Sequence, residues 1–327
     1  MKRLLCLVCA SLTLPSSLSA QEAKEPSGTK QITNSIGMKL TLVPSGEFKM
    51  GSGESAEAAE AFFTKTYRVH FLDAYDVKCE HPQHRVRITR PFYLGTYHVT
   101  RGQFRQFVAD TRYKTDAEKG KRPGARGWNP DTEALGFDEM YSWQGAGFEQ
   151  TDEHPVVCVS WNDAVAFCKW LGRNEGKTYR LPREAEWEYA CRAGTTTRYS
   201  SGDDPETLAK VGNVADAAAK AQFPGWAWTI KANDGYVFTA PVGKFEPNAF
   251  GLYDMHGNAL QWCADWYGLY NATSPTNDPT GPDFGDGRVL RGGSWLDGPG
   301  SCRSTSRGWG APDNRDSITG FRVARTQ

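Results

Sequence analysis

The sequence predicts one α+β domain with little regular secondary structure, preceded by a short segment that directs export. Three observations support this prediction. The first 20 residues have the pattern of a secretory signal. The remainder is rich in turn-forming residues, with 34 glycines and 18 prolines in the 327-residue chain. Clear helical periodicity is confined to a few segments, which alternate with short apolar runs typical of strands.

The export signal begins with a basic Met1-Lys2-Arg3, continues as an apolar run over 4–14, and ends in small residues at Ala20. We expect cleavage after Ala20 and a secreted or periplasmic mature protein. The apolar run is much shorter than the roughly 20 residues of a membrane span, and no later run is longer. The sequence therefore predicts no transmembrane anchor. The alternative is an N-terminal helix that stays on the folded protein.

After the signal peptide (1–20), the polar composition of 21–33 predicts a flexible linker, and 34–327 should form the folded domain. Short strands are expected at 38–43 and 46–51 around a Pro-Ser-Gly turn, and again at 84–88 and 92–95. Phe104 and Phe107 then fall at helical spacing, with Thr100 as the N-cap.

Residues 113–150 have no clear period and should form a long surface excursion. The run 156–159 is typical of a buried strand. Ser160 and Asp163 then form a capping-box pattern that predicts a helix. A second helix should span 181–190 and end near Gly194. Beyond this glycine, the sequence predicts mostly irregular structure.

Charge and cysteine content restrict the function classes. Basic and acidic residues both number 38, so the net charge is zero and a nucleic-acid partner is not expected. Two of the eight cysteines lie in the signal. The remaining cysteines would meet an oxidising compartment and could form disulfides, but the sequence does not choose their pairing. They are Cys79, Cys158, Cys168, Cys191, Cys263 and Cys302.

Several segments, taken in order, carry a family resemblance. They are 37–38 (GM), 44–51 (PSGEFKMG), 154–157 (HPVV) with 160–164 (SWNDA), 180–190 (RLPREAEWEYA), 251–258 (GLYDMHGN), 291–295 (RGGSW) and 320–322 (GFR). Together they resemble the formylglycine-generating enzyme family, also called sulfatase-modifying factors. The resemblance covers 34–327. It implies a fold related to C-type lectins and an O₂-dependent oxidation of a sulfatase cysteine to formylglycine.

The resemblance also implies a copper(I) site made of two cysteines, one two residues after the aromatic residue of the Gly-Gly-Ser-aromatic motif and one five residues later. Cys302 occupies the second position, and Asp297 stands at the first. Ser294 would lie beside them. A carboxylate is a hard ligand and a poor substitute for a thiolate at copper(I). The sequence thus leaves the enzymatic activity open. Alternatively, Cys302 pairs with Cys263 in a disulfide.

Other family disulfides start from the positions of Cys168 and Cys191. The resemblance places their partners at positions that hold Arg307 and Val323 here, so these bridges cannot form in the family manner.

Two calcium sites are implied by the resemblance, and calcium does take carbonyl, carboxamide and carboxylate oxygens. The expected ligands of the first are Asn213, Val214, Asp234 and Tyr236. Those of the second are Asp254, Gly257, Ala259 and Gln261. Gln261 stands where a glutamate is usual, and Asp254 offsets part of that lost charge. The alternative for both clusters is an ordinary Asx-type turn.

Three functions remain in competition. The first is oxidation of a cysteine in an unfolded sulfatase peptide. The second is a catalytically inactive module that binds a protein or glycan near Trp295 and Trp309, although such tryptophans more often anchor a core. The third is an accessory role for another exported protein. Of the remaining candidates, His256 is interpreted as a turn histidine. The glutamates at 184, 186 and 188 are interpreted as a solvated face with salt bridges.

Overall fold

The computed structural model describes residues 30–67, 77–119, 122–270 and 276–327. The expected signal peptide and most of the expected linker lie outside these ranges. The linker ends earlier than predicted, because Gln31–Thr33 form strand β1 and pair with β2. No helix within the described ranges is both long enough and apolar enough to span a membrane.

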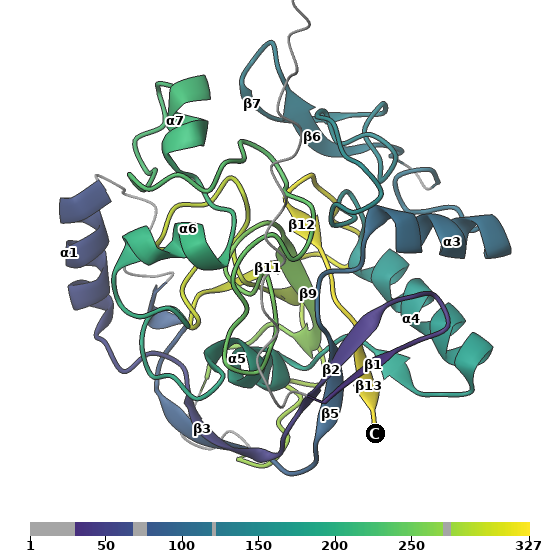
Figure 1. The fold of residues 1–327 in the computed structure, drawn as a ribbon, viewed down its shortest axis with the longest axis horizontal. Helices are drawn as coiled ribbons and strands as arrows, with labels where there is room; N and C mark the ends of the chain where they lie inside the picture. The colour runs from purple at the N-terminus through teal and green to yellow at the C-terminus, as the bar shows by residue number, and fades with distance from the viewer. Residues whose placement is uncertain (1–29, 68–76, 120–121, 271–275) are drawn as a thin grey trace, which may run out of the picture.

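A five-stranded sheet joins the two ends of the described chain. Its order is β1, β2 (Lys39–Val43), β5 (Phe92–Gly95), β13 (Ala324–Thr326) and β8 (Tyr179–Arg180), with every pair antiparallel. In Figure 1 the purple β1–β2 pair and the yellow β13 lie on either side of β5. The C-terminal strand therefore completes a sheet that the first strands begin.

A second sheet of four strands carries the C-terminal motifs. Its order is β11 (Arg307–Gly310), β10 (Arg288–Arg291), β9 (Leu260–Trp266) and β12 (Thr319–Gly320). Two further antiparallel pairs lie in the part of the chain that the structure describes. They are β3 (Gly46–Met50) with β4 (His84–Ile88), and β6 (Ala125–Asn129) with β7 (Ala134–Asp138). The predicted strands at 38–43 and 46–51 exist, but they belong to different sheets.

Helices cover these sheets from several sides (Figure 1). The longer ones are α1 (Ala56–Tyr67), α3 (Arg101–Thr111), α4 (Trp161–Glu175) and α5 (Glu184–Arg192). Short helical segments follow at η1 (Pro205–Thr207), α6 (Leu208–Val211) and α7 (Ala217–Gln222). The α+β class is confirmed.

Local capping explains where two helices begin. The hydroxyl of Thr100 accepts the backbone N–H of Gln103, and the Gln103 side chain accepts the N–H of Thr100. Ser160 and Asp163 form the same reciprocal pair at α4. Both N-caps are confirmed, because each box satisfies donors that have no partner within the helix. The two helices pack together through the Phe104 and Phe167 rings.

Two predictions of local structure are wrong. Residues 156–159 are fully buried, as expected, but they do not join a sheet. Their backbone pairs with isolated partners instead, since Val156 N–H donates to Val99 and Cys158 N–H to Asp316. The region 113–150, expected to be a surface excursion, contains the β6–β7 hairpin, whose Trp128 is buried.

Candidate functional site

The loop that follows β10 brings the predicted site residues together. Gly292 and Gly293 both have positive φ, which turns the chain sharply after Arg291. A Cβ atom on Gly293 would lie 2.5 Å from Sγ of Cys302, so this position has no room for a side chain. Trp295 is fully buried and its indole N–H donates to the Ser317 carbonyl at 3.1 Å. The glycine pair and the tryptophan thus fix the loop over 294–302.

Ser294, Asp297 and Cys302 meet within this loop. The Ser294 hydroxyl donates to Oδ2 of Asp297 at 2.6 Å, and Asp297 N–H donates to the Ser294 carbonyl at 3.0 Å. Sγ of Cys302 lies 4.0 Å from the carbonyl oxygen of Asp297. The sequence therefore predicted a set of residues that the structure does place side by side.

Burial determines the protonation of this group. It raises the pKa of the Asp297 carboxyl, and the hydroxyl of Ser294 opposes part of that rise. Burial, and then the neighbouring Asp297, raises the pKa of the Cys302 thiol well above its usual value. Because the thiolate is the metal ligand and the nucleophile, a thiol held neutral is a poor candidate for either role.

The residues here do not fit copper(I). Cys302 would be the one soft ligand of the implied pair, and the carboxylate at the other position already accepts a hydrogen bond from Ser294. In the described part of the chain, no group of three or more His, Cys, Asp or Glu side chains could hold a metal ion.

A pocket of about 420 Å³ lies beside this loop, with Asp297 on its wall. Most of the lining is apolar, and the indole N–H of Trp228 fixes one wall by donating to the Leu296 carbonyl at 2.9 Å. The lining residues are Phe63, Arg126, Trp128, Glu133, Ala134, Leu135, Trp226, Trp228 and 296–301. Sequence reasoning missed these tryptophans, although the Trp-Ala-Trp run at 226–228 was a visible signal.

Trp295 and Trp309, the tryptophans named in the sequence analysis, do not line this pocket. Trp295 and Trp262 are buried, and the Trp262 indole N–H donates to the Val159 carbonyl at 3.1 Å. Trp309 is 56% exposed, on the edge strand β11. Trp295 therefore anchors the core, as expected of most such tryptophans, and does not form the alternative binding surface with Trp309.

The alternative disulfide between Cys263 and Cys302 does not form. Both are buried free thiols, and they belong to different hydrophobic clusters. Cys158, Cys168 and Cys191 are also buried free thiols. Cys79 is buried too, and its side chain hydrogen-bonds Tyr267. The fold is held by packing and polar contacts at these positions.

His256 is hydrogen-bonded to the end of this loop at Cys302. Its Nε2 accepts the backbone N–H of Ser200 at 3.0 Å, so Nδ1 carries the proton and donates to the Cys302 carbonyl at 2.8 Å. Burial lowers its pKa to about 4, which keeps the imidazole neutral. Sγ of Cys191 lies 3.6 Å from Nε2. The turn histidine of the sequence prediction is a buried positioning residue.

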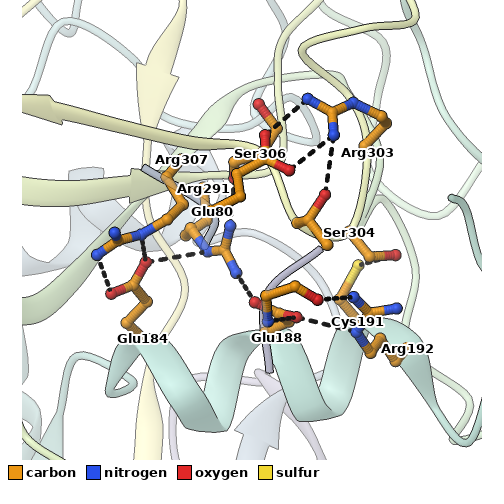
Figure 2. A network of polar contacts seen from close by, with 12 residues as sticks. Glu80, Glu184, Glu188, Cys191, Arg192, Arg291, Arg303, Ser304, Ser306 and Arg307 are labelled. Carbon is orange, nitrogen blue, oxygen red and sulfur yellow. Dashed lines mark hydrogen bonds and ion pairs between the residues drawn. The ribbon is translucent and has the colours of Figure 1, made fainter. Parts of the chain in front are cut away.

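The three glutamates of α5 do not form the solvated face that was predicted, since each is at most 5% exposed. Their predicted salt bridges are present, but inside the protein. Figure 2 shows Glu184 and Glu188 on the side of α5 that faces Arg291 and Arg307. Glu184 binds Arg307 through two contacts of 2.6 and 2.8 Å.

The remaining contacts complete a buried charge network. Glu188 binds both Arg192, at 2.9 Å, and Arg291. Behind them, Glu80 binds Arg303 through two contacts of 2.6 and 2.7 Å. Although burial opposes ionisation, Arg307 and Arg291 hold the pKa of Glu184 below its usual value. Arg307, the position at which the resemblance places a disulfide partner, is thus an ion-pair partner here.

The first predicted calcium cluster offers oxygen donors. The Asn213 amide donates to the Phe238 carbonyl at 2.7 Å, while its buried Oδ1 has no hydrogen-bond partner. Asp234 accepts the backbone N–H groups of Val214 and Tyr236, both at 2.9 Å, which gathers the four predicted residues. Burial raises the Asp234 pKa to about 7. The unpartnered amide oxygen of Asn213 and the carboxylate of Asp234 are both donor types that calcium takes.

The second predicted cluster is different, because Gln261 turns its amide NH₂, which cannot bind a cation, toward it. Oε1 of Gln261 accepts from the Trp187 indole at 2.7 Å and from Nε of Arg322 at 2.6 Å. Both partners are donors only, so the oxygen must face them. The amide NH₂ therefore faces the other way and donates to the Asp254 carbonyl at 3.2 Å.

Several backbone carbonyl groups at the second cluster already accept hydrogen bonds from side chains. His98 donates from Nε2 to the Ala259 carbonyl at 2.8 Å. Arg322 is fully buried and donates to the Tyr253 and Asp254 carbonyls at 2.8 and 3.3 Å. Oδ1 of Asp254 has no hydrogen-bond partner. A cation at this cluster would nevertheless meet the amide NH₂ of Gln261 and the guanidinium of Arg322. Gly257 lies at the turn with positive φ. This donor set does not fit calcium.

Comparison with known proteins identifies the family of the chain. Residues 27–327 match the sulfatase-modifying factor enzyme 1-like domain. The chain is 36% identical over 304 residues to the formylglycine-generating enzyme of Streptomyces coelicolor, covering 86% of this chain and 87% of that protein. It is 34% identical over 271 residues to the inactive C-alpha-formylglycine-generating enzyme 2 of Mus musculus, covering 75% and 78%.

A solved structure supports the same relationship. PvdO from Pseudomonas aeruginosa superposes with a TM-score of 0.69 and 30% identity, covering 93% of this chain and all of that one. The family model, the curated relatives and this structure therefore each match most of the chain as a single domain. The chain belongs to the formylglycine-generating enzyme, or sulfatase-modifying factor, family.

Proposed function

We propose that this protein is an exported family member that binds an extended peptide beside the 294–302 loop without oxidising it. The observation that carries the proposal is the half-buried Asp297, which lies on the wall of an open, largely apolar pocket at the position where the family resemblance implies a copper-binding cysteine. Pockets of this size lined by aromatic side chains with a few polar groups are typical ligand sites.

The state of Cys302 supports this proposal. Its thiol is fully buried, does not line the pocket, and has its pKa raised by burial. A peptide in the pocket would therefore meet the carboxyl group of Asp297 before it met the sulfur. The family also contains a protein named as inactive, which is 34% identical to this chain. An accessory role toward another exported protein is consistent with peptide binding.

The second candidate function is formylglycine generation on a sulfatase peptide. Two observations favour it. Cys302 keeps its place beside Ser294 and Asp297, and the chain is 36% identical to a named formylglycine-generating enzyme. In this function, Cys302 and Ser294 would be the catalytic residues, and Asp297 an altered ligand.

A turnover assay separates the two functions. The mature protein, 21–327, would be supplied with copper(I), O₂ and a Cys-x-Pro-x-Arg peptide, and the thiol-to-aldehyde mass loss read by mass spectrometry. We expect no conversion by the native protein and gain of conversion by Asp297→Cys. Conversion by the native protein that is lost in Cys302→Ser would contradict the non-oxidising proposal and establish the enzyme.

Calcium at the first cluster is a separate proposal. We propose that Asn213 and Asp234, with the carbonyl groups of Val214 and Tyr236, hold one calcium ion that stabilises the surrounding turns. The partnerless oxygen of Asn213 supports it. The melting temperature should rise with added calcium in the native protein and not in Asp234→Asn. An equal rise in both would contradict this site.

Export is proposed from the N-terminal pattern. We propose that residues 1–20 are removed as a signal peptide, and that a short linker leads to a domain that begins with β1. Sequencing the N-terminus of the protein recovered outside the cytoplasm should give Gln21. Recovery of the intact Met1 terminus in the cytoplasm would contradict export.

A further inference from the structure

The carboxyl group of Asp297 differs from the buried carboxylates of α5 in having no cation beside it. Within the part of the chain that the structure describes, Asp297 forms no salt bridge, and its one side-chain donor is the Ser294 hydroxyl. Leaving a half-buried carboxylate without a counter-ion is unfavourable. A ligand that brings a positive charge into the pocket would remove that cost.

The surroundings of the pocket add negative charge. Glu133 lines the same cavity, and Asp316 lies close enough to raise the pKa of Asp297 further. Among the described residues that line the pocket, Arg126 is the one basic side chain, but it is exposed, and it stabilises the charge of Asp316. The field at Asp297 therefore favours a cation.

The aromatic walls also favour a cation. Trp128, Trp226 and Trp228 all line the pocket. Trp226 is buried and stacked between Phe223 and Trp228, with ring centroids 4.7 and 5.1 Å away, so the half-buried Trp228 is the ring that can turn a face toward a ligand. The faces of tryptophan rings attract ammonium and guanidinium groups. The long aliphatic stem of a lysine or arginine would meanwhile contact the apolar lining formed by Leu135, Leu296 and Pro299.

We propose that the pocket selects a lysine or arginine side chain of the bound peptide, with the carboxylate of Asp297 as its counter-ion. This inference rests on the proposed peptide-binding function and specifies the chemistry of the ligand. Asp297 is then the determinant of specificity in this chain, in place of a metal ligand. The peptide is recognised by a charge–charge contact and by ring faces, and no bond is made or broken.

The test compares two peptides that differ by one charge. The probes are acetyl-Lys-Thr-Pro-Ser-Ala-amide and the same peptide with norleucine in place of lysine, titrated by calorimetry and tryptophan fluorescence at neutral pH. We expect the lysine peptide to bind at least about tenfold more tightly, because a hydrogen bond to a charged group contributes about 1.5–3 kcal/mol. The preference should weaken as salt is added.

Two variants make the test specific. Asp297→Asn keeps an acceptor for Ser294 but removes the charge, and it should abolish the preference for lysine. The matched control is Asp313→Asn, which removes an exposed carboxylate from a neighbouring pocket and should leave the preference intact. Melting temperatures of both variants would show that they are folded.

The outcomes separate this inference from the function on which it rests. Equal binding of the two peptides, or a lysine preference that survives Asp297→Asn, would overturn the assignment of Asp297 and leave peptide binding standing. Binding of neither peptide would overturn both.

Discussion

The charge network under α5 and the loop at 294–302 both bury carboxyl groups, yet they treat them in opposite ways. Glu184 and Glu188 each meet at least one arginine, and the guanidinium of Arg291 contacts both. Asp297 lies in the loop that follows β10, the strand that ends at Arg291. Its carboxyl group accepts the Ser294 hydroxyl, and the residue lines an open pocket. Paired charges hold the scaffold, whereas the unpaired one marks where a ligand would supply the missing partner.

The largest expected effect tests the paired region. Arg291→Met should lower the free energy of unfolding by about 3–5 kcal/mol, because it removes the fully buried guanidinium that contacts both Glu184 and Glu188 and leaves each glutamate with one arginine fewer. Chemical denaturation would measure the loss. The control is Arg85→Met, which breaks an exposed pair with Glu47 and should cost less than about 1 kcal/mol. Similar losses in both variants would mean that burial of the network contributes little.

A pH-dependent effect is expected at the edge of the network. Burial, and then Glu184, raises the pKa of Asp265 to about 7. Between about pH 4 and 7 the carboxyl ionises in the unfolded chain but stays protonated in the fold, so rising pH favours unfolding. Asp265→Asn removes this penalty. Its stability relative to the native protein should therefore grow across that window, by up to about 1.4 kcal/mol for each unit of raised pKa.

Denaturation of both proteins at pH 5 and pH 8 would measure this difference. Asn can still accept the Glu184 N–H that Asp265 accepts at 2.8 Å, so the helix N-terminus keeps its contact. A difference in stability that is the same at both pH values would contradict the raised pKa.

A smaller effect should appear at the second calcium cluster. Gln261→Glu keeps one oxygen on Trp187 and Arg322 and turns a second oxygen, instead of NH₂, toward Asp254. We expect the variant to gain a second calcium ion and about 1–2 kcal/mol of stability at saturating calcium. Equilibrium dialysis would count the ions. Two ions already bound by the native protein would show that the Gln261 amide does not exclude calcium.

The smallest stability effect is expected at Asp297 itself. Asp297→Asn should change the free energy of unfolding by less than about 1 kcal/mol, and in the stabilising direction, because no ion pair is lost. The same denaturation series would measure it. A loss as large as that of Arg291→Met would show that Asp297 is a structural residue, and the comparison between the two regions would fail.

Local signals made part of this fold predictable. Thr100 and Ser160 are followed at the right spacing by side chains that complete a capping box, so their helices could be placed from sequence. The strands β4 and β5 were also placed correctly. Sheet membership could not be placed, because it depends on pairings between distant segments such as β5 with β13.

The glutamates of α5 show why the burial of side chains was harder to predict than the helix that carries them. Alternating glutamates are typical of a solvated surface, and only the distant Arg291 and Arg307 make their burial tolerable. The motif around Ser294, Asp297 and Cys302 was visible in sequence because it is local. The pocket was not, because Trp128 and Trp226 reach it from separate segments. Gln261 was recognised as a departure, but its amide orientation depends on Trp187 and Arg322.

The buried thiols have a practical consequence. Cys158, Cys168, Cys191, Cys263 and Cys302 form no disulfides and are closed to solvent, so folding of the domain does not need an oxidant at these positions. The mature domain could then be produced in a reducing cytoplasm. A single cysteine introduced on an exposed surface would be the preferred target of a maleimide dye, which would allow a fluorophore to be attached beside the pocket without first removing the native sulfurs.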